Sequence, residues 1–330
     1  MEKKKLGNTD LEFTRIGLGT WALGGGDWKF GWGPQDEKDS VQSVVTAIES
    51  GINWIDTAAV YGGGVSETMV GRALKEIGAA NRPYVATKRG RVMRDGSTID
   101  KVLKRDSVIA ECEASLKRLD IDCIDLYQLH WPEPDEDIEE GWSALVTLKE
   151  QGKVREIGVS NHNVAQLKRL QAIHPVASLQ PPYSLIVPEV EKEILPYCGQ
   201  QDIGVICYSP MYKGLLTGKF TTERAAALSD SDHRSRDPHF QPPNIEAHLG
   251  LVECLAPLAK KHGRTLAELA IAWVLHRPEM TAAIVGARRP DQIAQTVSAA
   301  DWKLSDEDIT TIEQLRAGHR QALMHAATNG

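Results

Sequence analysis

The stretch that decides the fold covers residues 15–26 and reads RIGLGTWALGGG. Its residues Gly17, Gly19 and Ala22 match the spacing G-x-G-x-x-A, the loose form of the dinucleotide-binding fingerprint of Rossmann folds. That fingerprint leads directly into a helix, whereas in this chain the sequence continues as GGGDWKFGWGPQD over residues 24–36. The glycines and the proline of this continuation forbid a helix. The match is therefore a coincidence, and we expect a strand that ends in a long loop.

Eight short apolar runs share one pattern, because each ends in polar residues or glycine and precedes an amphipathic segment. These runs are residues 14–19, 52–56, 84–88, 124–130, 156–161, 176–180, 204–209 and 281–286. Apolar strands that are each followed by a helix are typical of a parallel sheet covered by helices. An open doubly wound sheet and a closed barrel both suit this pattern. Eight successive units with no shift in composition favour a single α/β domain over residues 1–330, a (β/α)8 TIM barrel.

Three segments depart from this alternation. Residues 1–14 place turn residues between apolar ones and predict a β-hairpin that closes the bottom of the barrel. Residues 212–244 predict a long irregular loop after the seventh strand, of a length that is often functional. We hypothesise that this loop folds over a bound ligand as a clasp. Residues 317–330 form a C-terminal tail, either disordered or folded back on the barrel.

Composition and charge narrow the class of protein. The chain has 330 residues, of which 42% are hydrophobic and 25% charged, as in ordinary globular proteins. The net charge of −7 indicates no basic face for nucleic acid, although it allows a small anionic ligand. No run reaches the roughly 18 apolar residues of a membrane span, and the five cysteines lack a C-x-x-C pair. We therefore expect a cytoplasmic protein with free thiols, without nucleic-acid or membrane partners, as a monomer or weak homo-oligomer.

Polar side chains stand at the C-terminal ends of the predicted strands, which meet at one mouth in a barrel. Asp56 ends the second strand, Lys88 the third and His130 the fourth, and Tyr61 follows Asp56 by five residues. Taken singly, each has an ordinary explanation as a cap, a surface charge or a packing residue. Taken together they are harder to explain, because a lysine buried at the mouth needs a partner, and Asp56 is placed to be that partner.

These four side chains suit the donation of a proton to a carbonyl oxygen. A tyrosine with a pKa near 10 is a poor acid at neutral pH, and we expect the Lys88 ammonium to lower the pKa of Tyr61. Asp56 would hold the ammonium, and His130 would donate a hydrogen bond to the substrate oxygen. No protein side chain supplies hydride, so a nicotinamide cofactor is implied.

Seven motifs occur in the order and at the spacing of the aldo-keto reductases, which the chain strongly resembles over residues 6–312. They read NWIDTAAVYGGGVSE, ATK, SLKRLDIDCIDLYQLHWP, GKVREIGVSN, QPPYSL, YSPMYKGLLTGK and IVGARRPDQ. The chain is most similar to the bacterial branch that contains the general stress protein and inositol-operon reductases. This resemblance implies a (β/α)8 barrel and a catalytic tetrad of Asp56, Tyr61, Lys88 and His130. Tyr61 would be the general acid in the reversible reduction of aldehydes or ketones to alcohols.

The resemblance also implies an NADP(H) molecule that lies extended across the mouth. The implied contacts with the nicotinamide end are Gly19, Thr20, Trp21, Asp56, Ser160, Asn161, Gln180 and Tyr208. Those with the pyrophosphate are Ser209, Pro210, Met211, Lys213, Gly214 and Lys219, and those with the adenosine end are Gly286, Arg288, Gln292, Gln295 and Thr296. The substrate would meet Trp21, Tyr61, His130 and Trp131.

The choice between NADP and NAD depends on two neighbouring arginines. A guanidinium suits a 2′-phosphate, so Arg288 favours NADP(H), and we expect Arg289 to be a solvated surface charge. The chain departs from the family pattern at His162, at Ser184 and at Gly286-Ala287, where many members carry a Lys-Ser pair. These departures leave the tetrad intact.

Two other functions stay open. A nucleotide-sensing regulatory subunit resembling the potassium-channel β subunits would keep the barrel and the cofactor but turn over slowly. No partner-binding extension is visible in this sequence to support it. A metal-dependent barrel hydrolase could use Asp56, Lys88 and His130, but such enzymes commonly carry His-x-His on an early strand, and none occurs in this chain. The physiological substrate is determined by loops whose shapes the sequence does not predict.

Overall fold

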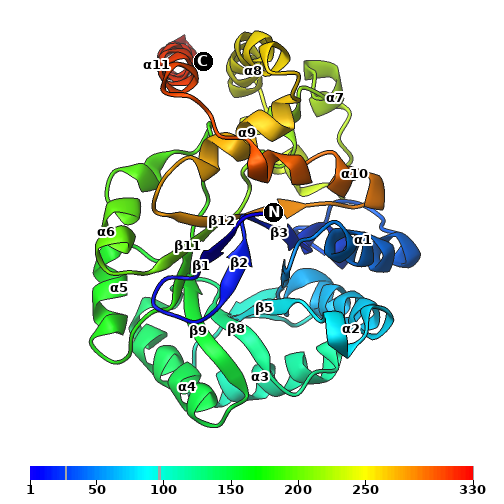
Figure 1. Cartoon of the computed structure of the whole chain (residues 1–330), viewed down its shortest axis with the longest axis vertical. Coiled ribbons are helices and arrows are strands. Elements are labelled where there is room, and N and C mark those ends of the chain that lie inside the picture. The colour runs from blue at the N-terminus through cyan, green and yellow to red at the C-terminus, as the bar shows by residue number, and fades with distance from the viewer. Residues whose placement is uncertain (27, 96–97, 330) are drawn as a thin grey trace.

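The computed structural model describes residues 1–26, 28–95 and 98–329, with side chains up to residue 324. Eight parallel strands close into a barrel, in which each strand pairs with the next one along the chain and the last pairs with the first (Figure 1). They are β3 (Ile16–Gly19), β4 (Trp54–Asp56), β5 (Tyr84–Arg89), β8 (Ile124–Leu129), β9 (Val154–Ser160), β10 (Ser178–Gln180), β11 (Gly204–Cys207) and β12 (Met280–Gly286). The predicted barrel is confirmed, and each of the eight apolar runs supplies one strand.

Helices surround the barrel on its outer side (Figure 1). Between and after the strands lie α1 (Glu37–Glu49), α2 (Val65–Ile77), α3 (Arg105–Leu119), α4 (Ile138–Glu150), α5 (Val164–Gln171), α6 (Ile194–Gln200), α8 (Asn244–Lys261), α9 (Leu266–Leu275) and α10 (Pro290–Ala294). Local signals in the sequence explain where several of them begin. Asp36 accepts a hydrogen bond from the Asp39 N–H at the start of α1, and Thr265 and Glu268 form a capping box on α9.

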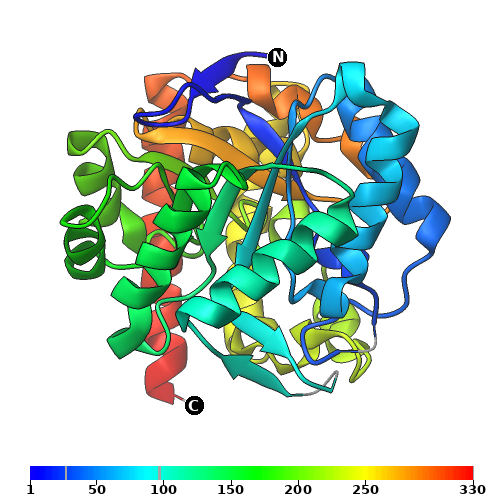
Figure 2. The same ribbon diagram turned by 90° about the horizontal axis from the view of Figure 1, so that it is seen from below.

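The N-terminal hairpin closes one end of the barrel, as predicted. Its strands β1 (Lys3–Lys5) and β2 (Glu12–Thr14) pair antiparallel. Leu6, Leu11 and Phe13 are fully buried against the barrel interior, where the Phe13 ring stacks on Trp54 with centroids 4.6 Å apart. The hairpin is thus an apolar floor that covers one end of the barrel. This leaves the opposite end, which lies across from the hairpin in Figure 2, for a ligand-binding site.

Three of the connections at the C-terminal end of the strands are long loops. The first joins β3 to α1, and the second carries a small hairpin of β6 (Arg91–Met93) and β7 (Ile99–Lys101), which the sequence did not indicate. The third follows β11 and has the predicted length. It is not irregular throughout, because it contains α7 (Thr222–Ala226) and 3-10 turns at Leu215–Thr217, His233–Arg236 and Pro238–Phe240.

The C-terminal segment folds back on the barrel as a helix. Helix α11 (Asp306–Asn329) continues through most of the predicted tail and packs along α8. The tail therefore belongs to the domain over the described part of the chain, and Gly330 lies outside the described residues.

Candidate active site

Lys88 connects the tetrad, and its ammonium uses all three of its protons. The Lys88 Nζ donates to Asp56 Oδ2 at 2.7 Å, to the Thr57 carbonyl at 2.8 Å and to the Tyr61 hydroxyl at 3.3 Å. Both members of the Lys88–Asp56 ion pair are almost fully buried. Burial raises the pKa of Asp56 and lowers the pKa of Lys88, while the attraction between the two charges opposes both shifts. Three acceptors around one nitrogen are the partners that a charged lysine requires.

The hydroxyl of Tyr61 accepts a hydrogen bond, and its own O–H remains available to donate to another partner. Because the Lys88 ammonium donates to the phenol oxygen, the Tyr61 O–H is not used in that contact. Burial raises the pKa of Tyr61 well above its ordinary value, and the negative charge of Asp56 adds to this. The expectation that Lys88 lowers this pKa is therefore wrong for the protein alone. The ammonium charge is balanced by Asp56, so Tyr61 is held as a neutral proton donor.

The imidazole of His130 faces the Tyr61 ring edge to face, with centroids 5.8 Å apart. Burial lowers the pKa of His130 well below its ordinary value, and the charges of Lys88 and Arg91 act in the same direction, so the ring is neutral. Within the described part of the chain, its Nδ1 is buried without a hydrogen-bond partner. A neutral imidazole carries one proton, and the tautomer that holds it on Nε2 has a donor available for a ligand.

A second layer of amide groups lies beneath the tetrad. The Gln180 side-chain N–H donates to Asp56 Oδ1 at 2.8 Å, and its nitrogen lies 3.5 Å from the Gln128 side-chain oxygen. Gln128 was not predicted from the sequence, although its position two residues before His130 on one strand places both side chains on the same face. Gln180, expected at the cofactor, therefore also orients Asp56.

A cavity of about 1350 Å³ opens above these groups. Drug-sized ligands occupy pockets of about 300–1,000 Å³, so this cavity has room for a cofactor and a substrate together. Among the described residues that line it are ten lysines and arginines but three carboxylates. A cavity this basic, in a chain of net charge −7, suits an anionic ligand.

The structure brings the residues of the predicted cofactor and substrate sites together at this cavity. All of them line it except Thr20, and of the tetrad only Lys88 is outside the lining. Lys88 lies below the lining and reaches it through Tyr61. Thr20 is fully buried and its hydroxyl donates to the Asp56 carbonyl, so the expected cofactor contact of Thr20 is corrected to a supporting one behind Asp56.

The ring of Tyr208 is fixed by a chain of hydrogen bonds. Its hydroxyl donates to the Asn161 side-chain oxygen at 2.9 Å, and the Asn161 amide donates to the His130 carbonyl and to Ser160 Oγ, both at 3.0 Å. Ser160 Oγ in turn donates to the Gln180 carbonyl at 2.7 Å. This chain links the ends of four strands, β8 to β11, and holds an aromatic platform at the mouth. Asn161 itself has a left-handed backbone, with φ of 63°.

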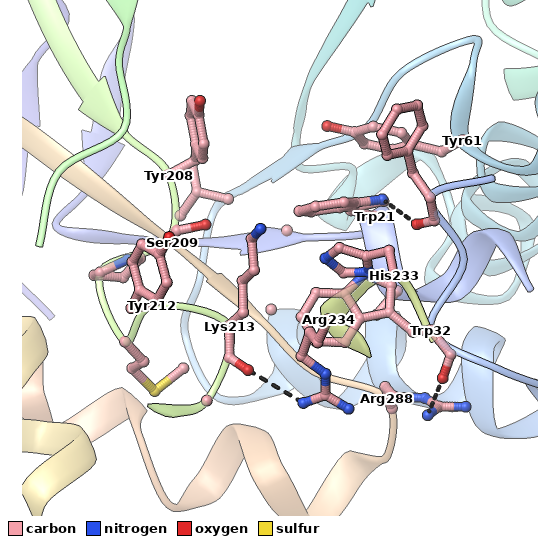
Figure 3. A pocket seen from close by; sticks show the side chains of 18 of the residues that line it. Trp21, Trp32, Tyr61, Tyr208, Ser209, Tyr212, Lys213, His233, Arg234 and Arg288 are labelled. Atoms are coloured by element: carbon pink, nitrogen blue, oxygen red, sulfur yellow. Dashed lines mark hydrogen bonds between the residues drawn. The ribbon is translucent and has the colours of Figure 1, made fainter. Parts of the chain in front are cut away.

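The segment after β11 reaches across the mouth to the first loop (Figure 3). Asp232 pairs with Trp32 in an isolated β-bridge, and the His233 ring lies between Trp21 and Trp32 with centroids 4.7 Å from each. At its other side the segment is tied by an ion pair of 2.6 Å between Lys213 and Asp237. The predicted clasp loop is thus in contact with the first loop across the cavity. His233 and Asp237 were not predicted from the sequence, because they belong to no motif.

The two arginines after β12 differ in exposure and in hydrogen-bond partners, and Arg289 is the solvated surface charge expected from the sequence. The Arg288 guanidinium donates to Gln35 and to the Trp32 carbonyl, each at 2.9 Å, and to the Pro34 carbonyl. It therefore secures the first loop while lining the cavity, and its expected contact with a 2′-phosphate stays a prediction. Arg289 has a side chain more than half exposed, paired with Asp291 two residues on. Such surface pairs are weak, so Arg289 is free to change partners.

The described residues form neither a metal cluster nor a membrane span. No group of three or more His, Cys, Asp or Glu side chains among them is arranged to hold a metal ion. Within the same residues, none of the helices combines the length and apolar character that crossing a bilayer requires. All five cysteines are free.

Comparison with known proteins supplies an independent line of evidence. A model described as "Aldo/keto reductase family" matches residues 15–317. The chain is 40% identical to aldo-keto reductase YhdN of Bacillus subtilis over 93% of this chain and 91% of that protein. It is 35% identical to a protein of Escherichia coli named NADH-specific methylglyoxal reductase, over 96% and 98% of the two chains.

Solved structures give the same result. The chain matches a glycerol dehydrogenase from Gluconobacter oxydans with a TM-score of 0.86 and 37% identity, over 96% of this chain and 95% of that one. It matches an aldo-keto reductase from Bacillus halodurans, in its holo form, with a TM-score of 0.80 and 27% identity, over 96% of each chain. The proteins named in these comparisons are reductases and a dehydrogenase, so the regulatory-subunit alternative is not favoured.

Proposed function

The chain belongs to the aldo/keto reductase family of oxidoreductases, which reduce carbonyl groups with a nicotinamide cofactor, and on that premise we propose that it reduces aldehydes and ketones with NADP(H). The observation that carries this proposal is the position of Lys88 between Asp56 and Tyr61. That arrangement leaves a neutral phenol with a free proton at the wall of the cavity.

Each member of the tetrad has a defined task in this reaction. Tyr61 gives its proton to the carbonyl oxygen and becomes a phenolate beside the Lys88 ammonium, which stabilises the new charge. His130 donates from Nε2 to the same oxygen and orients it. Asp56, itself oriented by Gln180, holds the ammonium at 2.7 Å. When bound, the nicotinamide would supply the hydride to the carbonyl carbon.

The lining of the cavity fits such a cofactor. The Tyr208 ring, fixed by Asn161, would support the nicotinamide, and the side chains of Ser160, Asn161 and Gln180 beside it are polar. Lys213 and Lys219 line the region where the pyrophosphate would lie. The segment tied by the Lys213–Asp237 ion pair would then act as a clasp over the cofactor.

The preference for NADP(H) rests on Arg289. This guanidinium lines the cavity near Gln292 and Gln295, and its weak surface pair with Asp291 can give way to a 2′-phosphate. The Escherichia coli relative is named NADH-specific, so a direct measurement has to decide this point. We place the activity in the cytoplasm, because a reducing compartment keeps thiols free.

The substrate would bind between apolar walls. Trp21, Trp28 and Tyr61 lie together, with the centroids of both indoles 6.2–6.3 Å from the Tyr61 ring, and Trp131 lines the cavity beside His130. These surfaces suit small carbonyl compounds with an apolar or aromatic part. Activated aromatic aldehydes are therefore suitable first probes.

The test compares the natural protein with Tyr61→Phe in the oxidation of NADPH at 340 nm with an activated aromatic aldehyde. We expect turnover with NADPH and a loss of about 100-fold or more in the variant, as for removal of a general acid. NADH is measured in parallel. NADPH binding without turnover of any carbonyl in a broad panel would favour a nucleotide sensor, and failure to bind either nucleotide would refute the proposed function.

A further inference from the structure

The β6–β7 hairpin brings one arginine to the substrate side of the cavity. Arg91 begins β6, three residues after Lys88, and its side chain lines the cavity while being only 12% exposed. The Arg91 Nη2 is paired with Glu133. Its Nη1 is buried and, within the described part of the chain, has no hydrogen-bond partner. An unpaired guanidinium nitrogen is costly, because a buried donor without an acceptor loses the hydrogen bonds that it made to water.

The neighbours of Arg91 place this unpaired donor next to the reacting groups. Its guanidinium lies 5.6 Å from the centroid of the Trp131 ring. Its charge contributes to the lowered pKa of His130. Glu133 is shared with Lys101, whose Nζ lies 3.0 Å from the same carboxylate oxygen, so two cations face one acid. The region therefore has a surplus of positive charge and of hydrogen-bond donors beside His130.

Taking the proposed carbonyl reduction as given, we propose that Arg91 determines substrate specificity by binding an oxygen on the carbon next to the reacting carbonyl. The preferred substrates are then 2-hydroxy or 2-oxo carbonyl compounds. His130 and Tyr61 would hold the carbonyl oxygen itself, and Arg91, which lines the same cavity near Trp131, would bind the neighbouring oxygen. Trp131, which is 38% exposed, covers the guanidinium and contacts the carbon chain.

The size of the expected substrate preference follows from the unpaired Arg91 Nη1. A substrate with a 2-hydroxyl group supplies the acceptor that Nη1 lacks, whereas an alkyl group of the same size leaves it unpaired. Hydrogen bonds to charged groups contribute about 1.5–3 kcal/mol, which corresponds to a factor of about 10 to 100 in kcat/KM. The apolar walls bind both substrates alike, so this factor appears as a preference between them.

The experiment uses hydroxyacetone and 2-butanone, two ketones with the same number of heavy atoms that differ by a hydroxyl in place of a methyl group. The ratio of their kcat/KM values is measured with saturating NADPH for the natural protein, Arg91→Met and Arg94→Met. Arg94 is the matched control, because it lies on the same hairpin and is paired across it with Asp100 but is 66% exposed and outside the cavity lining. We expect Arg91→Met to lower the ratio about 10- to 100-fold by slowing hydroxyacetone alone. Arg94→Met should leave the ratio within about twofold.

Other results would overturn the inference. An equal loss for both ketones in Arg91→Met would mean that Arg91 only supports the hairpin or His130. If Arg91→Met does not fold, Arg91→Lys decides, because it keeps the charge beside Glu133 but loses the second nitrogen, and an unchanged ratio there refutes the proposal. A natural enzyme that reduces the aromatic aldehyde but shows no preference for hydroxyacetone refutes the role of Arg91 and leaves the proposed function intact. Absence of turnover with every carbonyl instead refutes the proposed function.

Discussion

The tetrad and the loops around the mouth are built in different ways. Asp56 and Lys88 stand at the ends of neighbouring parallel strands, and the register of β4, β5 and β8 sets where they meet. Around the mouth, by contrast, position depends on contacts between loops that are distant in sequence, such as Trp32 with Asp232 and Arg288 with Pro34. The tetrad thus rests on the sheet, whereas the outer walls of the cavity rest on loop-to-loop contacts. Changes in the two regions should therefore have different consequences.

The largest effect is expected from Lys88→Met. Removal of one partner of a buried ion pair leaves Asp56 uncompensated and costs about 3–5 kcal/mol of unfolding free energy. Activity should fall about 100-fold or more, because the phenolate formed at Tyr61 loses its stabilising charge. Urea unfolding and NADPH oxidation measure the two effects. The double variant Lys88→Met/Asp56→Asn should regain most of the stability but none of the activity. A double variant as unstable as the single one would show that the ion pair is not the source of the loss.

A smaller effect should separate the two arginines after β12. Arg289→Met is expected to weaken NADPH binding about 10-fold and to leave NADH binding unchanged, because only NADPH carries the 2′-phosphate. Arg288→Met should weaken both cofactors equally, since it loosens the loop that contains Trp32 and Pro34. Fluorescence titration with each nucleotide gives the four affinities needed. A selective loss of NADPH binding in Arg288→Met would instead support the assignment made from the sequence.

The clasp should show a still smaller effect, in rates more than in affinity. Asp237→Asn removes the ion pair with Lys213, which joins the two ends of the segment over the cavity. We expect NADPH release to accelerate about fivefold in stopped-flow measurements, because loop opening controls release in many enzymes. Asp100→Asn, which breaks an exposed pair with Arg94 on the other hairpin, is the control. Release rates that are equal in both variants would mean that the segment does not act as a clasp.

The same division explains how far the sequence could be interpreted. Alternating apolar strands and amphipathic helices predicted the barrel, and the convergence of strand ends predicted that Asp56, Lys88 and His130 meet. No comparable pattern in the sequence predicted how the loops contact one another. The sequence could not show that Arg288 secures the first loop. Its three acceptors come from residues 32–35, which lie 253 to 256 positions earlier in the chain. Ser209 and Tyr212 have a left-handed backbone that directs the chain at the mouth. The sequence does not predict this conformation, because neither residue is a glycine. The pKa of Tyr61 was misjudged because burial, which depends on the finished fold, outweighs the nearby charge.

The smallest effect concerns the region where the long loop meets the C-terminal helices. His239, His248 and His319 form a hydrogen-bonded row, with 2.9 Å from His239 Nδ1 to His248 Nε2 and 2.8 Å from His248 Nδ1 to His319 Nε2. The row joins the loop to α8 and α11. Burial lowers the pKa of His248 to about 3 and that of His319 to about 4, while the pKa of His239 is lowered as well. His248 and His319 are therefore neutral in the folded protein at pH 5.

An unfolded histidine has a pKa near 6.5, so at pH 5 the unfolded chain binds more protons than the folded one. The stability contributed by these two rings is thus fully present above pH 6.5 and declines as the pH falls toward their folded pKa values. We expect the Tm to fall by several degrees between pH 7 and pH 5. Each kilocalorie of lost unfolding free energy lowers the Tm by roughly 2 °C in a domain of this size. The double variant His248→Gln/His319→Gln should have a lower Tm at pH 7, because it loses the hydrogen-bonded row. Its Tm should then decline less steeply with falling pH, because two titrating rings are gone. A double variant with the same decline as the natural protein would assign the pH dependence to other buried histidines, such as His162 and His233, whose pKa values burial also lowers to about 4. The row would then hold the loop on α8 and α11 without making that contact sensitive to pH.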